Sequence, residues 1–411
     1  MTMLLEKPPL LAPAGRLAKL ADQCVQCGLC LPVCPTYALD RNEAESPRGR
    51  IAIASALARG LVDPTLELRE HLDHCLGCLN CETACPAHVQ YDELLIETRA
   101  LLGPARRRPR LLIGLITRPR WLAAARRVGH WIALPRWKSR LARQLPHASA
   151  WRSALLLVPS AAPALLARRS SAFQGKDRVA LFPGCVASVE DAAAQQAVVT
   201  LLEAAGFQVN RLPAFCCGAM DLHGGELVAA TEAAQRIREV WENSGATTLL
   251  SVTPGCLGTL RRALPGVEVI DPVALLADRA ESLHFRPLAE KIALHLPCTQ
   301  INVAGTDAAL LRLLRRIPQL EVTPVSRSAN CCGAAGSHML EYPERADRLR
   351  DATLRDLAAL HASQMLSSNI GCRLHLAAGI AQQGWNLPTQ HPLTLLAKQL
   401  VQAHTHTLER P

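Results

Sequence analysis

The sequence is poor in aromatic residues and has no long apolar run. Phe, Trp and Tyr make up 3% of the 411 residues, so a core has to be built from Ala, Leu, Val and Ile. No stretch reaches the roughly 18 consecutive apolar residues of a membrane span, because the nearest candidate, 153–167, contains Pro159 and Pro163. Residues 1–11 lack the order of charge, apolar stretch and cleavage site of a signal peptide. With 49% hydrophobic and 19% charged residues, we expect a folded, cytoplasmic protein.

Acidic residues are missing from one segment. Residues 101–170 hold 15 Arg or Lys and no Asp or Glu, so the formal charge of +10 is local and the other residues carry −5, which is 10 minus 15. Four tryptophans lie among these basic residues: Trp121, Trp131, Trp137 and Trp151. The mixture suits contact with a partner subunit or with a membrane surface, peripheral on the inner membrane, but a solvated linker explains it equally well. We expect no nucleic-acid partner, since no recognisable nucleic-acid module accompanies the charge.

Cysteine, by contrast, is abundant, with 16 residues. Without export these are unlikely to form disulfides, and their spacing indicates cluster ligands. One run is Cys24, Cys27, Cys30 and Cys34, followed by Pro35. A second run has the same spacing: Cys75, Cys78, Cys81 and Cys85, followed by Pro86. This C-x2-C-x2-C-x3-C-P pattern is typical of [4Fe–4S] ferredoxins, whereas zinc favours two separated cysteine pairs.

The two runs predict two clusters with crossed ligands. Three thiolates at i, i+3 and i+6 can surround one cubane and leave its fourth iron for a distant cysteine. Cluster 1 would then bind Cys24, Cys27, Cys30 and Cys85, and cluster 2 would bind Cys75, Cys78, Cys81 and Cys34. Two helix-like stretches, 50–58 and 66–74, separate the runs and predict a helical two-cluster module. Arg48 and Arg50 in this interval are either counter-charges to a cluster or ordinary surface residues.

The remaining eight cysteines form a repeat. One copy contains Cys185, Cys216–Cys217–Gly218 and Cys256, and the other contains Cys298, Cys331–Cys332–Gly333 and Cys372. The offsets of 113, 115 and 116 between equivalent positions indicate a duplicated unit. Short apolar runs such as 179–182 and 292–296 alternate with helical stretches such as 192–205 and 345–360, which predicts parallel α/β units with cysteines where strands end.

Histidines accompany the repeat. His223 and His338 each lie six residues after their CCG pair, so they are either ligands or proton partners, or loop residues inherited through duplication. His295 lies in an apolar run and is better explained as a core histidine.

This layout resembles the cysteine-rich domain family that includes heterodisulfide reductase, and its order and length are similar to those of bacterial glycolate oxidase iron–sulfur subunits. CVQCGLCLPVCPTY at 24–37, SPRGRI at 46–51 and CCGAAGS at 331–337 carry the resemblance. The expected fold is α+β and multidomain, a helical two-cluster ferredoxin module followed by a duplicated α/β cysteine-rich pair. The expected domains are 1–103 (ferredoxin), 104–176 (basic linker), 177–285 and 286–411 (CCG).

The resemblance implies an electron-transfer subunit of a flavin-dependent 2-hydroxy acid dehydrogenase. A flavin-bearing partner would oxidise glycolate, and D-lactate as well, and this chain would pass the electrons to a quinone-type acceptor. The chain has no convincing G-x-G-x-x-G fingerprint, so FAD is expected only in the partner. The alternatives are the iron–sulfur subunit of an anaerobic glycerol-3-phosphate or lactate dehydrogenase, and a heterodisulfide reductase-like catalytic subunit.

The repeat departs from the family pattern in its last element. Thr259 and His375 stand where a C-x2-C would be completed, so each copy has four cysteines rather than five. Three interpretations of the candidate metal sites stay open: a catalytic non-cubane cluster, an additional cluster or zinc, and thiols without metal. Their candidate ligands are Cys185, Cys216, Cys217, Cys256, Cys298, Cys331, Cys332 and Cys372.

Overall fold

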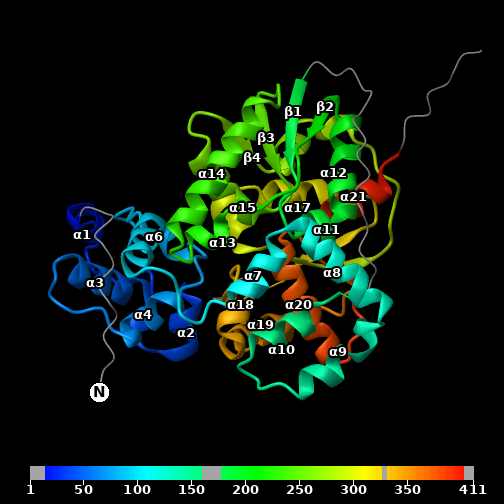
Figure 1. Ribbon diagram of the computed structural model, residues 1–411. Helices are drawn as coiled ribbons and strands as arrows, with labels where there is room; N and C mark the ends of the chain where they lie inside the picture. The colour runs from blue at the N-terminus through cyan, green and yellow to red at the C-terminus, as the bar shows by residue number, and fades with distance from the viewer. Residues whose placement is uncertain (1–13, 160–176, 326–330, 402–411) are drawn as a thin grey trace, which may run out of the picture.

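The computed structural model describes residues 14–159, 177–325 and 331–401, and its N-terminal part is a module of helices (Figure 1). They are α1 (Ala14–Asp22), α2 (Pro35–Asp40), η1 (Glu43–Glu45), α3 (Pro47–Ala58), α4 (Leu66–Asp73), α5 (Asn80–Thr83) and α6 (Tyr91–Leu102). The Ser46 side chain caps α3 by accepting a hydrogen bond from the Gly49 N–H, and Thr65 caps α4 in the same way. Apolar side chains of α1, α3, α4 and α6 meet in one buried cluster. The predicted helical module is confirmed.

The basic segment forms a layer of helices rather than an extended connection. These are α7 (Arg110–Ile116), α8 (Pro119–Trp131), α9 (Leu134–Arg143) and α10 (Ala150–Leu157). Pro119 and Pro135 lie in the first turns of α8 and α9, where a missing N–H is tolerated. Arg168 and Arg169, the last basic residues of the segment, lie outside the described residues.

The first lobe is a four-stranded parallel sheet with the order β2-β1-β3-β4. Its strands are β1 (Asp177–Phe182), β2 (Phe207–Arg211), β3 (Thr248–Ser251) and β4 (Glu268–Ile270). Its helices are α11 (Ala187–Glu190), α12 (Ala192–Ala204), α13 (Ala219–Leu222), α14 (Leu227–Glu242), α15 (Pro254–Ala263), α16 (Pro272–Asp278) and η2 (Ala280–Ser282). All four residues of β3 are buried, as expected for a strand covered on both faces.

The second lobe repeats this topology, with the order β6-β5-β7-β8. Its strands are β5 (Lys291–His295), β6 (Glu321–Pro324), β7 (Gln364–Ser367) and β8 (Thr389–Gln390). Its helices are η3 (Gln300–Ala304), α17 (Asp307–Arg315), α18 (His338–Glu341), α19 (Pro343–Ala358), α20 (Ile370–Gln382) and α21 (Pro392–Gln399). Equal strand order in two cysteine-bearing units confirms the predicted duplicated α/β pair.

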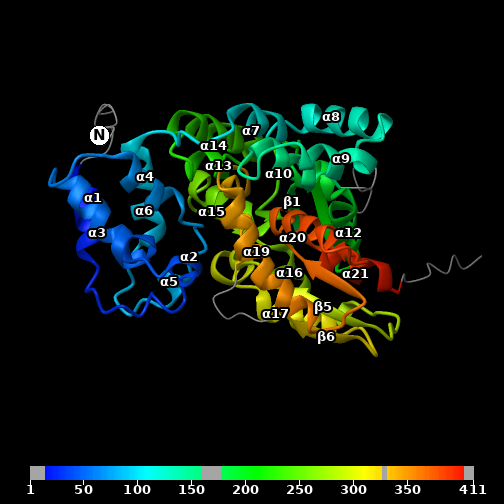
Figure 2. The same ribbon diagram turned by 90° about the horizontal axis from the view of Figure 1, so that it is seen from below.

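The two lobes share one hydrophobic core. Helix α12 of the first lobe packs on α21 of the second, and α16 packs on α17. A single buried cluster contains residues of both lobes, among them Val198 and Leu202 with Leu310 and Leu396. The helical module lies beside the lobe pair, as Figure 2 also shows.

Within the described ranges, no helix combines the length and the apolar character that crossing a bilayer requires.

Candidate iron–sulfur and thiol sites

The two cysteine runs fold into loops with the same backbone pattern. Gln26 and Gly28 in the first loop have positive φ angles of 56° and 82°, and Gly77 and Leu79 in the second have 58° and 61°. These positions are equivalent in the two runs, two and four residues after the first cysteine. Left-handed residues turn the chain sharply. The turns bring thiols that are three residues apart to the inside of each loop.

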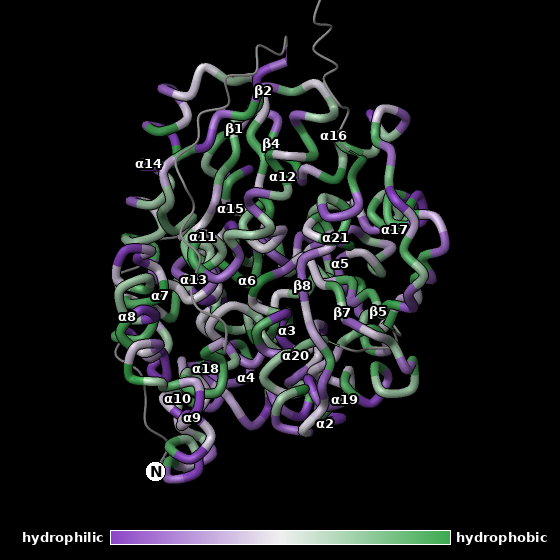
Figure 3. Tube along the Cα trace, turned by 90° about the vertical axis from the view of Figure 1, so that its right-hand side faces the viewer, coloured by the Kyte–Doolittle hydropathy of each residue, from purple (hydrophilic) through white to green (hydrophobic). Residues whose placement is uncertain are grey.

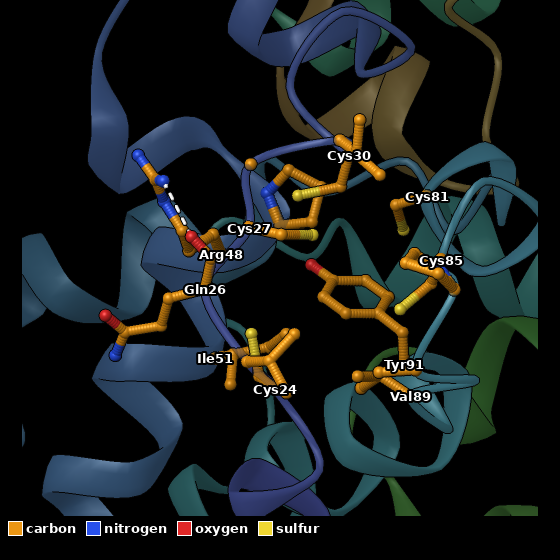
Figure 4. Close-up of a pocket in the computed structure, with 16 residues that line it drawn as sticks. Cys24, Gln26, Cys27, Cys30, Arg48, Ile51, Cys81, Cys85, Val89 and Tyr91 are labelled. Atoms are coloured by element: carbon orange, nitrogen blue, oxygen red, sulfur yellow. Dashed lines mark hydrogen bonds between the residues drawn. The ribbon is translucent and has the colours of Figure 1, made fainter.

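The first pocket combines the beginning of one run with the end of the other. Cys24, Cys27 and Cys30 of the first run line it together with Cys81 and Cys85 of the second. The cysteine side chains lie around a common space next to the ring of Tyr91 (Figure 4). The side chain of Arg48 also lines this pocket and forms an ion pair of 2.8 Å with Glu43.

The second pocket has the complementary set. Cys75, Cys78, Cys81 and Cys34 line it. Tyr91 lines both pockets, and its hydroxyl donates a hydrogen bond of 3.6 Å to the Cys75 sulfur. The structure therefore brings Cys85 to the first run and Cys34 to the second, while Cys81 and the buried Tyr91 line both pockets.

The donors in both pockets fit iron–sulfur clusters. Neither set of lining residues includes a carboxylate or an imidazole, and soft thiolates alone are the ligands of [4Fe–4S] centres. Burial raises the pKa values of the Cys30, Cys78 and Cys81 thiols. Buried thiols crowded together become thiolates only when a cationic centre compensates their charge. Iron would supply that compensation.

A buried ion-pair network borders the second pocket. Arg50 is fully buried, lines the pocket, and forms an ion pair of 2.8 Å with Glu45. His71 and His74 each place Nδ1 2.7 Å from the other oxygen of this carboxylate. Burial opposes ionisation of Glu45, but hydrogen bonds from His74 and His71 and the charge of Arg50 lower its pKa to about 2. Arg345 of the second lobe lies 3.2 Å from the same carboxylate, so two guanidinium groups disfavour a divalent cation here.

The eight remaining cysteines form two quartets at equivalent places in the lobes. Cys185 follows β1, Cys216 and Cys217 follow β2, and Cys256 lies in the first turn of α15 after β3. The second quartet, Cys298, Cys331, Cys332 and Cys372, follows β5, β6 and β7 in the same way. The quartets therefore lie at the carboxyl edges of the parallel sheets, where ligands of such sheets bind.

Each CCG motif favours one thiolate. Hydrogen bonds from Cys185 and Cys217 lower the pKa of Cys216, and those from Cys298 and Cys332 lower the pKa of Cys331. The glycine N–H adds to this effect, because Gly218 donates to the Cys216 sulfur at 3.4 Å and Gly333 to Cys331 at 3.5 Å. Both glycines have positive φ, and a Cβ on Gly333 would overlap the carbonyl oxygen of Ala346. Glycine therefore serves the motif in two ways: it adopts the positive φ without a Cβ clash, and its N–H stabilises the cysteine thiolate.

The second quartet lies next to the second pocket. The thiols of Cys331 and Cys298 lie close enough to Cys78 for their charges to interact. Leu76 packs against Cys331 in a small buried cluster. Asn302 of η3 donates a hydrogen bond of 2.7 Å to the carbonyl of Cys78. The second lobe therefore contacts a cluster loop directly.

The first quartet has a different neighbour. Its Cys216 interacts with the charge of Arg108, which is buried and bonds to Asp221 of α13 at 2.6 Å. The first lobe contacts the helical module through Arg262 and Asp92, 2.6 Å apart on α15 and α6, and through the His223 carbonyl, which accepts a hydrogen bond from Arg99. The duplicated quartets are therefore not equivalent in position.

His223 and His338 occupy equivalent positions in the two sequence repeats, but their environments in the structure differ. His338 is buried, places Nδ1 3.3 Å from the Gly333 carbonyl, and has a pKa lowered to about 3 by burial. His223 is partly exposed, and its carbonyl accepts a hydrogen bond from Arg99. His295 is buried and bonds to Ser367, as a core histidine does. Thr259 and His375 are buried on α15 and α20, with His375 Nε2 3.3 Å from the Ala346 carbonyl.

Sequence reasoning missed the inward role of several arginines. Arg108 and Arg126 belong to the basic segment, yet both are buried, and Arg126 forms an ion pair of 2.6 Å with Glu190. Arg345 joins Glu45 and Asp40 across the module boundary. The acidic partners are 64 or more residues away in sequence. No local spacing pattern identifies such pairs.

Family models match both parts of the chain. A "4Fe-4S dicluster domain" matches residues 20–89. A "Cysteine-rich domain" matches twice, at residues 179–261 and 292–377. The matched ranges contain the eight cysteines of the two pockets and all the cysteines of the two quartets.

Similar proteins match most of the chain. The glycolate oxidase iron–sulfur subunit of Escherichia coli K12 is 30% identical over 86% of this chain and 89% of its own length. A probable glycolate oxidase iron–sulfur subunit of Bacillus subtilis 168 is 28% identical over 88% and 89%. A hypothetical protein from Helicobacter pylori has a similar fold, with a TM-score of 0.50 and 10% identity over 95% of this chain and 72% of that one. The chain belongs to the family of glycolate oxidase iron–sulfur subunits, which joins a two-cluster ferredoxin domain to paired cysteine-rich domains.

Proposed function

We propose that this chain is the electron-transfer subunit of a flavin-dependent dehydrogenase that oxidises glycolate to glyoxylate, with D-lactate as a second substrate. The observation that carries the proposal is a pair of adjacent thiol-lined pockets, which together gather all eight cysteines of the two runs and share Cys81 and Tyr91 as lining residues. Such closely spaced sites suit the passage of single electrons through one protein. We propose no catalytic residue in this chain, because substrate oxidation belongs to a partner subunit.

The ligand assignment is part of the proposal. Cluster 1 takes Cys24, Cys27, Cys30 and Cys85, and cluster 2 takes Cys75, Cys78, Cys81 and Cys34, in agreement with the lining of the two pockets. Each [4Fe–4S] cluster, when bound, supplies a one-electron carrier. The chain positions the eight thiols, excludes water from Cys34 and Cys81, and places buried Arg50 beside the second pocket. An additional cluster or zinc at the quartets belongs to the same proposal.

The partners follow from what the sequence does not supply. The chain has no convincing dinucleotide fingerprint, so FAD would be bound by the flavoprotein subunits of a hetero-oligomer. The electrons would leave to a quinone-type acceptor, with the complex in the cytoplasm and peripheral on the inner membrane. We propose the domain ranges 1–103, 104–176, 177–285 and 286–411 for this subunit, with the second range a helical layer on the lobes rather than a free linker.

The native complex provides the test. It would be purified through a tag on this chain, and iron, sulfide, zinc and flavin would be quantified together. Anaerobic addition of glycolate should bleach the partner flavin and produce EPR signals of two reduced clusters. Trace iron and sulfide, or no flavoprotein in the complex, would contradict the proposal. Bleaching by glycerol 3-phosphate but not by glycolate would identify the alternative dehydrogenase.

Single cysteine variants test the crossed ligands. Cys34→Ser should alter the cluster held by Cys75, Cys78 and Cys81, although Cys34 belongs to the other run. Cys85→Ser is the matched variant and should alter the cluster held by the first run. EPR spectra of variants of each run, compared in pairs, report which thiols share a cluster. Equal spectra for Cys34→Ser and Cys24→Ser would refute the crossing.

The proximity of the second quartet to Cys78 favours one further candidate, a disulfide-reducing activity at Cys331 and Cys332. Replacement of both by serine would then abolish turnover while the ferredoxin EPR signals and the partner binding persist. Unchanged turnover would leave electron transfer as the function.

A further inference from the structure

Helix α8 carries apolar side chains on the face that points away from the protein. Trp121, Val128 and Trp131 are 65%, 59% and 86% exposed. Ala124 and Ala125 are exposed beside them. The spacing of these five residues, at 0, 3, 4, 7 and 10 from Trp121, places them on one side of an α-helix. We call this row of side chains the α8 stripe.

The other side of α8 is fixed to the protein. Leu122 and Ala123 are buried against Val189 of α11. The buried Arg126 binds Glu190 of the same helix at 2.6 Å. Because these contacts hold α8 through this side, the α8 stripe faces outward. Helices α7 and α8 lie at the outer edge of the molecule in two views (Figures 2 and 3).

Positive charge lies on α8 and on the neighbouring helices α7 and α9, which contact it. The exposed arginines of residues 104–159 are Arg106, Arg107, Arg110, Arg118, Arg120, Arg127, Arg136, Arg140 and Arg143. Among them, Arg107 and Arg110 have ion-pair partners, Glu70 and Glu226, and the part of the chain that the structure describes offers the others no carboxylate. Since residues 101–170 contain no Asp or Glu, the charge of this surface is not balanced locally.

This combination matches an anionic bilayer surface. An interfacial helix inserts a stripe that contains Trp into the headgroup boundary, while arginines beside it attract anionic lipid. Indole rings prefer this boundary because they are apolar with one polar N–H. A protein partner would have to present matching negative charge over the whole surface.

We propose that the α8 stripe and its surrounding arginines bind an anionic lipid surface, with the rings of Trp121 and Trp131 in the headgroup boundary. The inference deepens the peripheral membrane contact of the proposed function and assigns it to named residues. It does not depend on electron transfer, since neither cluster pocket includes a residue of α8.

Vesicle binding by the purified, cluster-loaded protein tests the proposal. The protein should sediment with vesicles of phosphatidylcholine and phosphatidylglycerol, more weakly at high salt, and hardly at all with phosphatidylcholine alone. Brominated lipid should quench its tryptophan fluorescence. The variant Trp121→Ser/Trp131→Ser should lose roughly tenfold or more in partitioning, because two large apolar side chains no longer enter the boundary.

Matched controls separate the stripe from general apolar or basic surface. Val228→Ser on α14 removes an equally exposed apolar side chain (76%) and should leave vesicle binding unchanged. Arg120→Glu/Arg127→Glu should reduce binding to anionic vesicles, whereas Arg312→Glu on the exposed side of α17 should not. Iron content and EPR spectra should be the same in all variants.

Two results would overturn the inference. One is binding to anionic vesicles that the α8 variants do not change. The other is a parent protein that does not bind vesicles, together with a Trp121→Ser/Trp131→Ser variant that loses the flavoprotein from the native complex. That pair of results would show that the α8 stripe is a protein interface. Loss of iron with intact vesicle binding would instead count against the proposed electron-transfer function and leave this inference standing.

Discussion

At the scale of single residues, the two arginines of the SPRGRI stretch lie in very different environments, which their spacing in the sequence does not indicate. Arg48 and Arg50 are two residues apart, yet Arg48 has a third of its side chain exposed and Arg50 has 1%. Arg50 donates to the Thr36 hydroxyl and the His71 carbonyl in addition to Glu45. A buried cation with so many fixed partners is part of the protein interior. Its charge lies beside thiols of the second pocket.

Replacement of Arg50 by glutamine should lower stability and change one reduction potential. Removal of one partner from a buried ion pair costs about 3 kcal/mol of unfolding free energy. Without the guanidinium, the added electron is less stabilised, so the potential of cluster 2 should fall by roughly 50 mV. EPR-monitored redox titration and denaturant unfolding provide the two measurements.

Arg48→Gln is the control for this change. It removes an arginine that lines the first pocket, but solvent screens its charge, so the free energy of unfolding should change little. Equal potential shifts in both variants would contradict a specific role of burial at Arg50.

At the scale of elements, loops and strand ends decide where the thiols lie. Cysteine spacing predicted that each run turns three thiols inward, and a few left-handed residues in each loop produce that turn. The spacing did not indicate that Cys81 lines both pockets. The helices at 192–205 and 345–360 were also predictable from their periodicity, as α12 and α19 confirm. β4, β6 and β8 were not, since strands of two to four residues at partly exposed edges carry no clear alternation. Burial of Arg108 depends on α13 and α18, which only the tertiary fold brings to it.

The glycine of the second CCG motif should tolerate no side chain. Gly333→Ala adds a Cβ at φ +76° that overlaps the Ala346 carbonyl, so we expect a loss of about 3 kcal/mol or more. Gly384 has a similar φ of +72° but no atom within 4 Å of its Cβ position. Gly384→Ala should therefore cost only about 1 kcal/mol. Denaturant unfolding of the two variants distinguishes crowding from backbone strain, and equal costs would exclude crowding.

Acid should weaken the N-terminal cap of the last helix, α21. His391 is buried, accepts a hydrogen bond from the Leu393 N–H, and has a pKa lowered from 6.5 to about 4 by burial. The unfolded chain therefore protonates this histidine near pH 6.5, whereas the folded chain does so only near pH 4. The free energy of unfolding is thus highest above pH 6.5 and decreases as the pH drops toward 4. The loss for this residue between about pH 6.5 and about pH 5.5 is about 1 kcal/mol.

His391→Asn keeps a capping acceptor and removes the titration. Unfolding free energies measured at about pH 7.5 and about pH 5.5 should show a smaller difference in the variant than in the parent protein, by about 1 kcal/mol. The buried His295 and His375 should retain part of the acid sensitivity, because burial lowers their pKa values to about 4 as well. An unchanged pH dependence would show that His391 is not the group responsible.

At the scale of the whole molecule, the helical module rests on the second lobe through charged contacts near the cysteine loops. Arg345 of α19 reaches Asp40 at 2.6 Å and Glu45 at 3.2 Å. Together with the Asn302 contact to Cys78, it fixes the distance between the second pocket and the second quartet. Which quartet would lie beside the second pocket could not be predicted, because the duplicated sequences give both lobes the same motif.

Arg345→Gln should loosen this contact. We expect a loss of about 1–2 kcal/mol and faster hydrogen exchange in the loop between α2 and α3, since Asp40 and Glu45 both lose a partner. Arg348→Gln is the matched control on the same helix. Arg348 is 59% exposed, and its ion pair with the same Asp40 is longer, at 3.8 Å. That variant should change stability by less than about 0.5 kcal/mol. Similar exchange rates in both variants would contradict the assigned role of Arg345.

The packing of α12 on α21 and of α16 on α17 is reciprocal, because α12 and α17 follow equivalent strands, as do α16 and α21. This is the geometry of an isologous dimer whose two subunits have been joined into one polypeptide. A lobe expressed alone would expose the apolar surface of these helices and would be expected to pair with a second copy of itself. Within one polypeptide, however, the two quartets need not be identical, and here one lies beside the loop of Cys78 and the other beside Arg108.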